Sequence, residues 1–183
     1  MFKTIALSVA VLLLLAIGIV LLLAARKPDA FRVERSTVIQ APPVRVFALV
    51  NDLPAWRAWS PYEKKDPAMQ RSYSGPSSGV GAAYAWEGNG QVGQGTMKIV
   101  QSVPAERVSL QLDFIKPFEG HNIADFSFVP EANGQATRVT WAMHGPAPFV
   151  SKIMQVLMDF DKMIGRDFET GLADLKTAAE KTN

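Results

Sequence analysis

Residues 83–116, AYAWEGNGQVGQGTMKIVQSVPAERVSLQLDFIK, carry the most informative pattern in this chain. Apolar and polar residues alternate along it, which is typical of β-strands with one buried face. The alternation is interrupted at Gly88-Asn89-Gly90 and at Pro104-Ala105, residue types that favour turns between antiparallel strands. The stretch therefore predicts consecutive antiparallel strands joined by hairpins.

Counting outward from each predicted turn gives the residues that lie opposite each other. With Asn89-Gly90 as a two-residue turn, aromatic rings would cover strand glycines, a known compensation for the missing side chains. The pairs expected in this hairpin are Trp86 with Gly93, Tyr84 with Gly95 and Ala82 with Met97. Turns at Pro104-Ala105 and Asn133-Gly134 add Ile99 with Leu110, Met97 with Leu112, Gly95 with Phe114, Phe128 with Val139, Phe126 with Trp141 and Ala124 with Met143. All three turns place apolar side chains on one face, which is predicted to be the inner face of a sheet.

The segments on either side of this meander complete one folding unit. Residues 31–41 alternate like a first strand, and residues 43–52, PVRVFALVND, have the spacing of a short helix with proline in its first turn. A second short helix or turn carries Trp56 and Trp59. Residues 149–179 are predicted to form one amphipathic helix whose apolar stripe covers the inner face. The stripe consists of Val150, Ile153, Leu157, Phe160, Ile164, Phe168, Leu172 and Leu175.

Strand, short helices, antiparallel meander and long final helix follow one another in the order of the helix-grip fold, an α+β fold whose curved sheet wraps the last helix. Residues 31–176 resemble the START-like (SRPBCC) superfamily, in its polyketide cyclase/dehydrase-like branch. Three segments carry the resemblance: APPVRVFALVNDLPAWRAWSPYEKKDP, YAWEGNGQVGQGTMKI and MDFDKMIGRDFETGLADLK. The resemblance implies a cavity between the concave sheet face and the last helix. It leaves the activity open, because lipid carriers and cyclases share the fold.

The N-terminal segment differs from the rest of the chain. IALSVAVLLLLAIGIVLLLAA, residues 5–25, has no charge and as a helix would span about 32 Å, enough to cross a hydrocarbon core of about 30 Å. A cleaved signal is the alternative, but its apolar part is usually only about 7–15 residues and ends in a small-x-small site. We therefore expect a single-pass anchor at residues 1–27 and a helix-grip domain at residues 28–183. Lys3 before the span and Arg26 and Lys27 after it leave the membrane side of the domain undetermined.

The predicted inner face supplies the candidate ligand-binding residues. Its aromatic and methionine side chains suit a hydrophobic ligand, with methionine adapting to the ligand's shape and indole N–H groups orienting a polar end. The candidates are Tyr84, Trp86, Met97, Phe114, Phe126, Trp141 and Met143 from the sheet, and Met154 and Met158 from the final helix. A filled core is the alternative for each of them. Trp56 and Trp59 are expected at the cavity entrance, or as a plug that closes the end of the sheet.

Composition and register disfavour several other functions. The chain of 183 residues has no cysteine, which excludes disulfides and thiolate chemistry, and its net charge of +2 is too small and dispersed for a nucleic-acid groove. His121 and His144 fall on the outer face by the predicted register, and two ligands on a solvent face rarely hold a metal. Asp113 and Asp125 also point outward. We therefore expect no metal site, no cofactor and no catalytic residues.

These observations favour a membrane-tethered, non-catalytic binding or carrier domain for a hydrophobic small molecule or lipid. One alternative is a polyketide cyclase or dehydratase-like enzyme, in which the cavity folds a reactive chain and Tyr84 moves a proton. Another is an interaction module that uses apolar residues of the outer face, such as Ile115 and Ile123.

Overall fold

A computed structural model describes residues 2–181 of the chain, and internal contacts divide it into two units. The first unit contains the chain up to Phe31 together with Pro146–Phe160. The second contains Arg32–Gly145 and the chain from Asp161 onward. The sheet and the long helix therefore belong mainly to the second unit.

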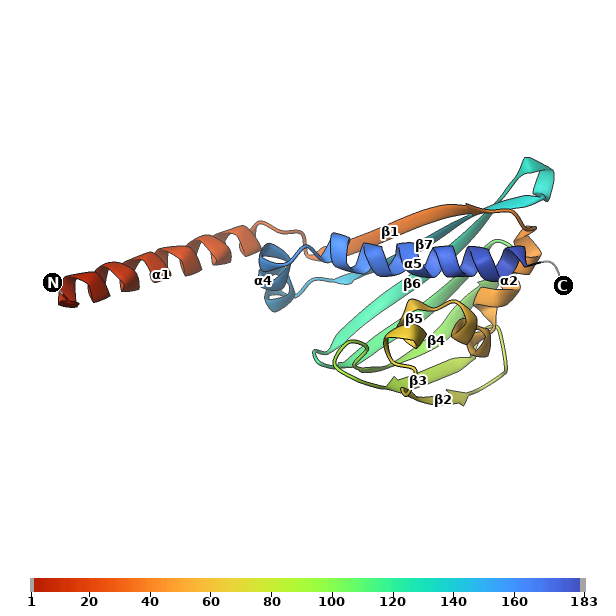
Figure 1. The fold of residues 1–183 in the computed structure, drawn as a ribbon, viewed down its shortest axis with the longest axis horizontal. Coiled ribbons are helices and arrows are strands. Elements are labelled where there is room, and N and C mark those ends of the chain that lie inside the picture. Colours follow the sequence, from red (N-terminus) through yellow and green to blue (C-terminus); the bar gives the residue numbers. More distant parts are fainter. Residues whose placement is uncertain (1, 182–183) are drawn as a thin grey trace. The chain divides into compact units, whose positions relative to one another are not determined.

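Within the described residues, the second unit is built on one sheet of seven strands in the order β1-β7-β6-β5-β4-β3-β2 (Figure 1). Each strand from β2 to β6 pairs antiparallel with the next strand along the chain. The strands are β1 (Ala30–Ile39), β2 (Gln70–Ser74), β3 (Ala83–Glu87), β4 (Gln94–Val103), β5 (Arg107–Lys116), β6 (Gly120–Glu131) and β7 (Ala136–Pro146). This is the meander that the alternation predicts, with the first strand added at the β7 edge.

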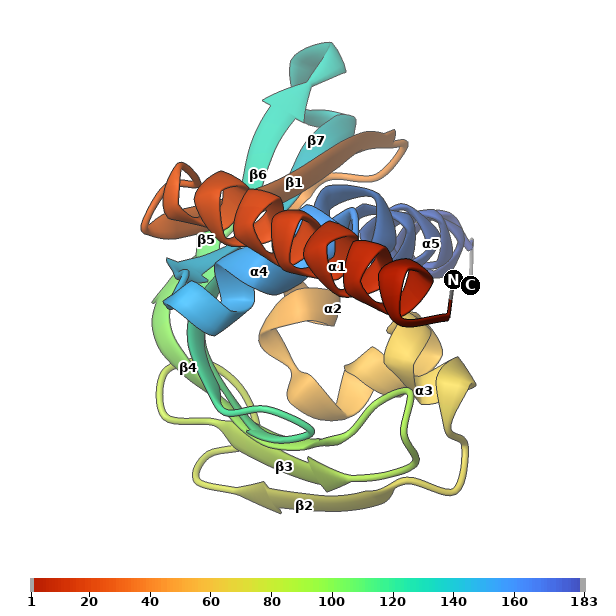
Figure 2. The ribbon, with the colours of Figure 1, turned by 90° about the vertical axis from the view of Figure 1, so that its left-hand side faces the viewer.

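Four helices of this unit accompany the sheet. They are α2 (Pro43–Asn51), the 3₁₀ helix η1 (Leu53–Ala58), α3 (Pro61–Lys65) and α5 (Phe160–Glu180). A further 3₁₀ turn, η2 (Ala132–Gly134), joins β6 to β7. Figure 2 shows the sheet curving around α2, α3 and α5. The predicted α+β helix-grip fold is confirmed.

The register of the later hairpins agrees with the predicted pairs. The β4–β5 pairs run from Gly95–Phe114 to Ile99–Leu110, and the β6–β7 pairs include Phe126–Trp141. The β4–β5 connection is one residue longer than predicted, because Val103 pairs with Arg107. The register shift between Ile99 and Gln101 leaves one extra residue in β4, and this bulge restores the predicted pairing.

The predicted register of the first hairpin is wrong by two residues. Glu87 pairs with Gln94, so Trp86 lies opposite Gly95 and Tyr84 opposite Met97. The loop is wider than a two-residue turn because Asp66 accepts a hydrogen bond from the Asn89 amide at 2.7 Å, which ties the loop to the segment after α3. A shift of two preserves the face of every side chain, so the predicted inner face survives the error.

The prediction of one continuous final helix is also wrong. The chain forms α4 (Phe149–Leu157) and then α5, and Met158 between them has an extended backbone with φ −136° and ψ 137°. The Met158 amide closes the last turn of α4 by donating to the Met154 carbonyl at 2.8 Å. The predicted stripe is therefore divided between two helices.

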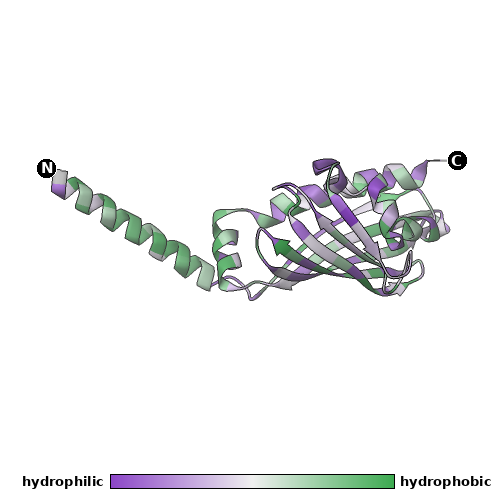
Figure 3. Cartoon of the chain, turned by 90° about the horizontal axis from the view of Figure 1, so that it is seen from below, coloured by the Kyte–Doolittle hydropathy of each residue, from purple (hydrophilic) through white to green (hydrophobic). Residues whose placement is uncertain are grey.

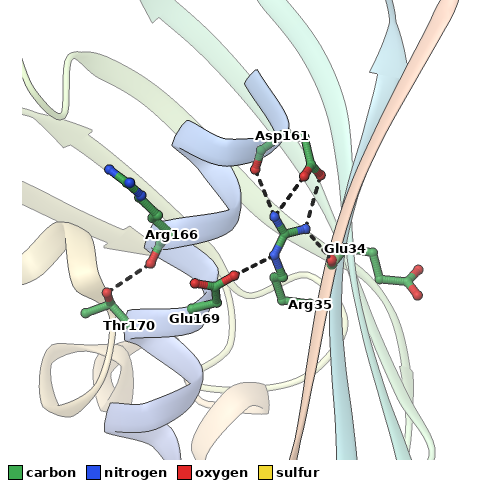
Figure 4. Close-up of polar contacts among 6 residues, drawn as sticks. All are labelled: Glu34, Arg35, Asp161, Arg166, Glu169 and Thr170. Carbon is green, nitrogen blue, oxygen red and sulfur yellow. Dashed lines mark hydrogen bonds and ion pairs between the residues drawn. The ribbon is translucent and has the colours of Figure 1, made fainter. Parts of the chain in front are cut away.

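Arg35 of β1 holds the beginning of α5 (Figure 4). Its guanidinium donates to both Asp161 carboxylate oxygens, at 3.1 and 2.9 Å, and to Glu169 Oε1 at 2.8 Å. Gly165 leaves space for this side chain, because a Cβ there would lie 2.0 Å from Arg35 Nη2. The ion pairs raise the pKa of Arg35 and lower the pKa of Asp161. Lys65 at the end of α3 also forms an ion pair with α5, through Asp167 at 2.6 Å.

The first unit consists of α1 (Phe2–Ala25), α4 and the segments beside them. Residues Lys3–Ala25 are long and apolar enough to cross a membrane, and nearly all of them are exposed, although a signal sequence would pass the same test. Apolar residues predominate along α1 (Figure 3). Helices α1 and α4 contact each other, and Asp29 accepts hydrogen bonds from Lys152 Nζ at 2.5 Å and from the Ala147 amide at 2.7 Å.

Candidate functional site

The observed register assembles the predicted sheet residues on one face. Residues directly opposite each other in paired strands share a face, so each row across the sheet can be followed through the pairs. One row contains Arg71, Trp86, Gly95, Phe114 and Gly120. The next contains Tyr73, Tyr84, Met97, Leu112 and Asn122. Two further rows contain Leu110, Ala124 and Met143, and Val108, Phe126 and Trp141. All seven sheet candidates therefore lie on the inner face.

Part of the inner face is covered by a cluster of aromatic rings in contact with one another. Trp141 stacks on Phe168 of α5 with ring centroids 4.1 Å apart, and on Phe126 at 4.9 Å. Trp56 and Trp59 contact the same rings edge-on and are buried. Their indoles donate to main-chain carbonyls of α2, at 2.9 and 3.0 Å. This placement favours the plug over the entrance for the two tryptophans.

Another part of the inner face is incompletely covered. Met97, Leu112 and Phe114 are only half-buried, whereas Phe126 and Trp141 are 0% and 3% exposed. Trp86 lies over Gly95, where a Cβ would be 2.5 Å from the indole ring, so the glycine allows this close approach. Apolar side chains thus remain accessible on the side of the sheet that the helices cover elsewhere.

Trp141 carries a buried hydrogen-bond donor that has no partner among the described residues. The indoles of the other three tryptophans each donate to a main-chain carbonyl. A Cβ at Gly171 would lie 2.8 Å from Trp141 Cζ3, so this edge of the ring faces α5. Because Nε1 lies on the opposite edge of an indole, the unpartnered N–H points away from Gly171.

A polar cluster borders the inner face at β2 and β3. The Tyr84 hydroxyl donates to Glu63 Oε1 at 3.1 Å, and Arg71 donates to Glu63 Oε2 through Nε at 2.8 Å and Nη2 at 2.5 Å. Arg71 also donates to the Met69 carbonyl. The side chains of Arg71 and Glu63 are 11% and 9% exposed. Burial, and then the Glu63 carboxylate, raise the pKa of Tyr84, so its phenol keeps its proton at neutral pH.

The cluster places a carboxylate and a guanidinium beside the predicted ligand-binding residue Tyr84. Neither Glu63 nor Arg71 is among the site residues predicted from the sequence. The strand QRSYS could have indicated Arg71, because residues two apart in a strand share a face and Arg71 and Tyr73 both lie on the inner face. The contact between Arg71 and Glu63 could not be predicted from the alternation within one strand or helix. It depends on the turn that brings α3 and β2 together.

A family model for "Polyketide cyclase / dehydrase and lipid transport" matches residues 30–180, which span the sheet and α5. The chain belongs to this family. The match covers the two segments that form the inner face and the helix over it. The predicted membership of the START-like superfamily, polyketide cyclase/dehydrase-like branch, is confirmed.

Solved structures similar to this polyketide cyclase/dehydrase family member show the same fold. A protein of Chromobacterium violaceum aligns with a TM-score of 0.58 at 18% identity, covering 85% of this chain and 100% of that one. A Thermobifida fusca protein aligns with a TM-score of 0.59 at 21% identity, covering 81% and 92%. The Aha1 dimer of Colwellia psychrerythraea gives 0.58 at 18%, covering 82% and 96%. No curated protein matches the chain by sequence. At these identities the likeness concerns the fold alone.

The two histidines of this family member each have a carboxylate partner. His121 Nδ1 lies 2.7 Å from Asp113, and His144 Nε2 lies 3.0 Å from Asp125. In the described part of the chain, three or more side chains able to hold a metal ion do not come together anywhere. Asp125 also accepts a hydrogen bond from Ser109, which binds it into the sheet.

Met154 and Met158 belong to a different unit from the sheet candidates. Both precede Asp161 and belong to the first unit, Met154 in α4 and Met158 at its C-cap. They were assigned to the inner face because one continuous helix was expected. The extended backbone at Met158 removes that basis, and their role as ligand contacts stays a prediction.

Proposed function

We propose that this protein is a membrane-tethered, non-catalytic binding or carrier domain for a hydrophobic small molecule or lipid. The observation that carries the proposal is the partial exposure of Met97, Leu112 and Phe114 on the inner face. Leaving apolar area open to water costs about 25 cal/mol per Å², so a hydrophobic ligand that covers it gains binding free energy. The family description, which includes lipid transport, supports the same class of ligand.

We infer that the ligand also carries a hydrogen-bond acceptor that pairs with the Trp141 indole. A buried donor without a partner costs about 1–3 kcal/mol, which a ligand's hydrogen-bond acceptor would recover. The Nε1 of Trp141 is such a donor. A hydrophobic molecule with a carbonyl or ether oxygen therefore fits the inner face better than a pure hydrocarbon.

Benzophenone is a suitable probe, because it is hydrophobic, carries one carbonyl and attaches to nearby C–H groups when illuminated. We expect peptides from β4, β5 and β7 of the full chain in nanodiscs to be labelled. The substitution Trp141→Phe removes the free donor and should lower labelling of these strands about fivefold, the equivalent of one hydrogen bond of about 1 kcal/mol. Peptide mass spectrometry measures the labelled fraction.

Trp86→Phe provides the matched control. Trp86 also lies on the inner face, but its N–H already donates to the Val92 carbonyl at 3.0 Å, so labelling should stay close to that of the unmodified chain. Diphenylmethane, which lacks the carbonyl, should compete less well than unlabelled benzophenone. Labelling confined to α1, or equal in both variants, contradicts the proposed ligand contact.

The tether gives the ligand a route. We propose that α1 crosses the membrane, with the side of the domain left open, and that the ligand comes from or returns to the bilayer. The length and the apolar, unburied surface of α1 support this. A chain lacking residues 1–25 should lose function in cells while retaining benzophenone labelling of the sheet. Full function of the truncated chain would remove the bilayer from the proposal.

The Glu63–Arg71–Tyr84 cluster favours a second candidate, a polyketide cyclase or dehydratase-like enzyme. The protonated Tyr84 phenol would exchange its hydrogen bond to Glu63 for one to a substrate oxygen on the inner face and so steer the folding of the substrate. A synthetic linear triketone tests this. Enzymatic cyclisation that falls in Tyr84→Phe, with folding intact, supports the enzyme, and the spontaneous rate in every sample supports the carrier.

A further inference from the structure

Helix α4 is amphipathic in the reverse sense for a helix in water. A surface helix normally buries its apolar side and exposes its polar side. In α4, Val150 and Leu157 lie seven residues apart on one face and are 63% and 66% exposed, and Phe149 beside them is 48% exposed. Lys152 is 8% exposed. The apolar side of α4 therefore faces outward.

The inward side of α4 is polar and is used to hold the helix. Lys152 Nζ pairs with Asp29 at 2.5 Å, and Asp29 lies in the same unit. Gln155, three residues further along this side, has a buried Nε2 without a partner among the described residues. A helix that places lysine and glutamine inward and valine and leucine outward is suited to surroundings that are themselves apolar.

Asp29 also limits how far α4 can lie from the end of α1. Helix α1 ends at Ala25, and four residues of extended chain span at most about 14 Å. The headgroup region on each side of a bilayer is roughly 5–8 Å thick. If α1 crosses the membrane, the segment that binds Lys152 starts within reach of the membrane surface. Arg26 and Lys27 at the same point suit anionic headgroups.

We propose that α4 is a membrane-interface helix whose outward face, formed by Phe149, Val150 and Leu157, inserts into the acyl boundary of the bilayer that holds α1. This inference rests on the proposed membrane tether and adds a second contact with the same bilayer. It commits to lipid as the occupant because α4 contacts α1, the one helix of the described chain that is long and apolar enough to span a membrane. If α4 lies in the interface beside the end of α1, the segment around Ala147, just before α4, also stays at the membrane.

The test uses single cysteines, because the natural chain has none. Full-length variants V150C and L157C are labelled with a fluorophore and reconstituted into two sets of phosphatidylcholine vesicles, one brominated near the headgroup end of the acyl chains for α4 and one brominated near their methyl end for the middle of α1. Leu14 in α1 is 69% exposed and supplies the positive control L14C. Val129 in β6 is 53% exposed and supplies the matched control V129C. Bromine quenches only fluorophores in contact with lipid.

Quenching of V150C and L157C at about twice the level of V129C or more is expected for a helix lying in the interface. If L14C is quenched and both α4 positions match V129C, the interface helix is wrong while the tether stands. If L14C is not quenched either, the tether itself is wrong. Shielding of α4 by a second copy of the chain would give the V129C level and would also overturn the proposal.

Discussion

Helices α4 and α5 share one predicted amphipathic stripe, but α5 buries its apolar residues and α4 exposes them. In α5 the apolar residues Phe168, Leu172 and Leu175 are at most 2% exposed. In α4 the equivalent stripe residues Val150 and Leu157 are more than half exposed. A helical period shows that an apolar face exists. It does not show which medium covers that face, protein in one helix and, as we propose, lipid in the other.

The largest expected difference separates two identical substitutions, Leu172→Ala and Leu157→Ala. Leu172 is 2% exposed, and its truncation should lower the free energy of unfolding by about 2–5 kcal/mol. Leu157 is 66% exposed, and its truncation should change that free energy by no more than about 0.5 kcal/mol. Urea unfolding of the full chain in nanodiscs, followed by tryptophan fluorescence, measures both. Equal losses would remove the distinction between the helices.

A smaller effect is expected at the contact between α5 and the aromatic cluster. Gly171→Ala places a Cβ 2.8 Å from Trp141 and 2.9 Å from the ring of Pro61, two groups that cannot easily move. Overpacking costs about 1–3 kcal/mol and is offset by a gain in helix propensity of about 1 kcal/mol. Gly165→Ala would displace the Arg35 guanidinium from its ion pairs with the exposed carboxylates of Asp161 and Glu169, which contribute little to stability, so its loss should be smaller. The reverse order in thermal unfolding would contradict the packing described at Trp141.

The smallest effect concerns the acid dependence of α5. Arg35 lowers the pKa of Asp161, so this carboxylate stabilises the folded chain above its ordinary pKa of about 4. That contribution is lost as the pH falls through the lowered pKa. Arg35→Gln should therefore flatten the decline of the urea midpoint at the acid end of a titration from pH 7 to pH 2.5. Arg32→Gln, on the same strand but paired with Glu34, should leave the decline unchanged.

The inner face shows how far sequence reasoning extends. Side-chain parity placed Tyr84, Met97 and Trp141 correctly, because a strand alternates faces whatever its partner. The predicted faces stayed correct in the first hairpin, although the observed register differs by two residues and Asp66 binds the loop. The Glu63–Arg71 ion pair could not be predicted from side-chain alternation, because it depends on how α3 packs beside β2.

Local sequence patterns were enough to predict the apolar N-terminal helix, the strands and their faces, and the family, because each depends on residues close together in the chain or on a pattern with a fixed period. The break at Met158, the bulge in β4, the polar cluster at Tyr84 and the unpartnered N–H of Trp141 emerged from the folded chain. Each of these depends on which distant segments compete for the same backbone or side-chain group. The outward apolar face of α4 belongs with them, since burial is a property of the folded chain and of the medium around it.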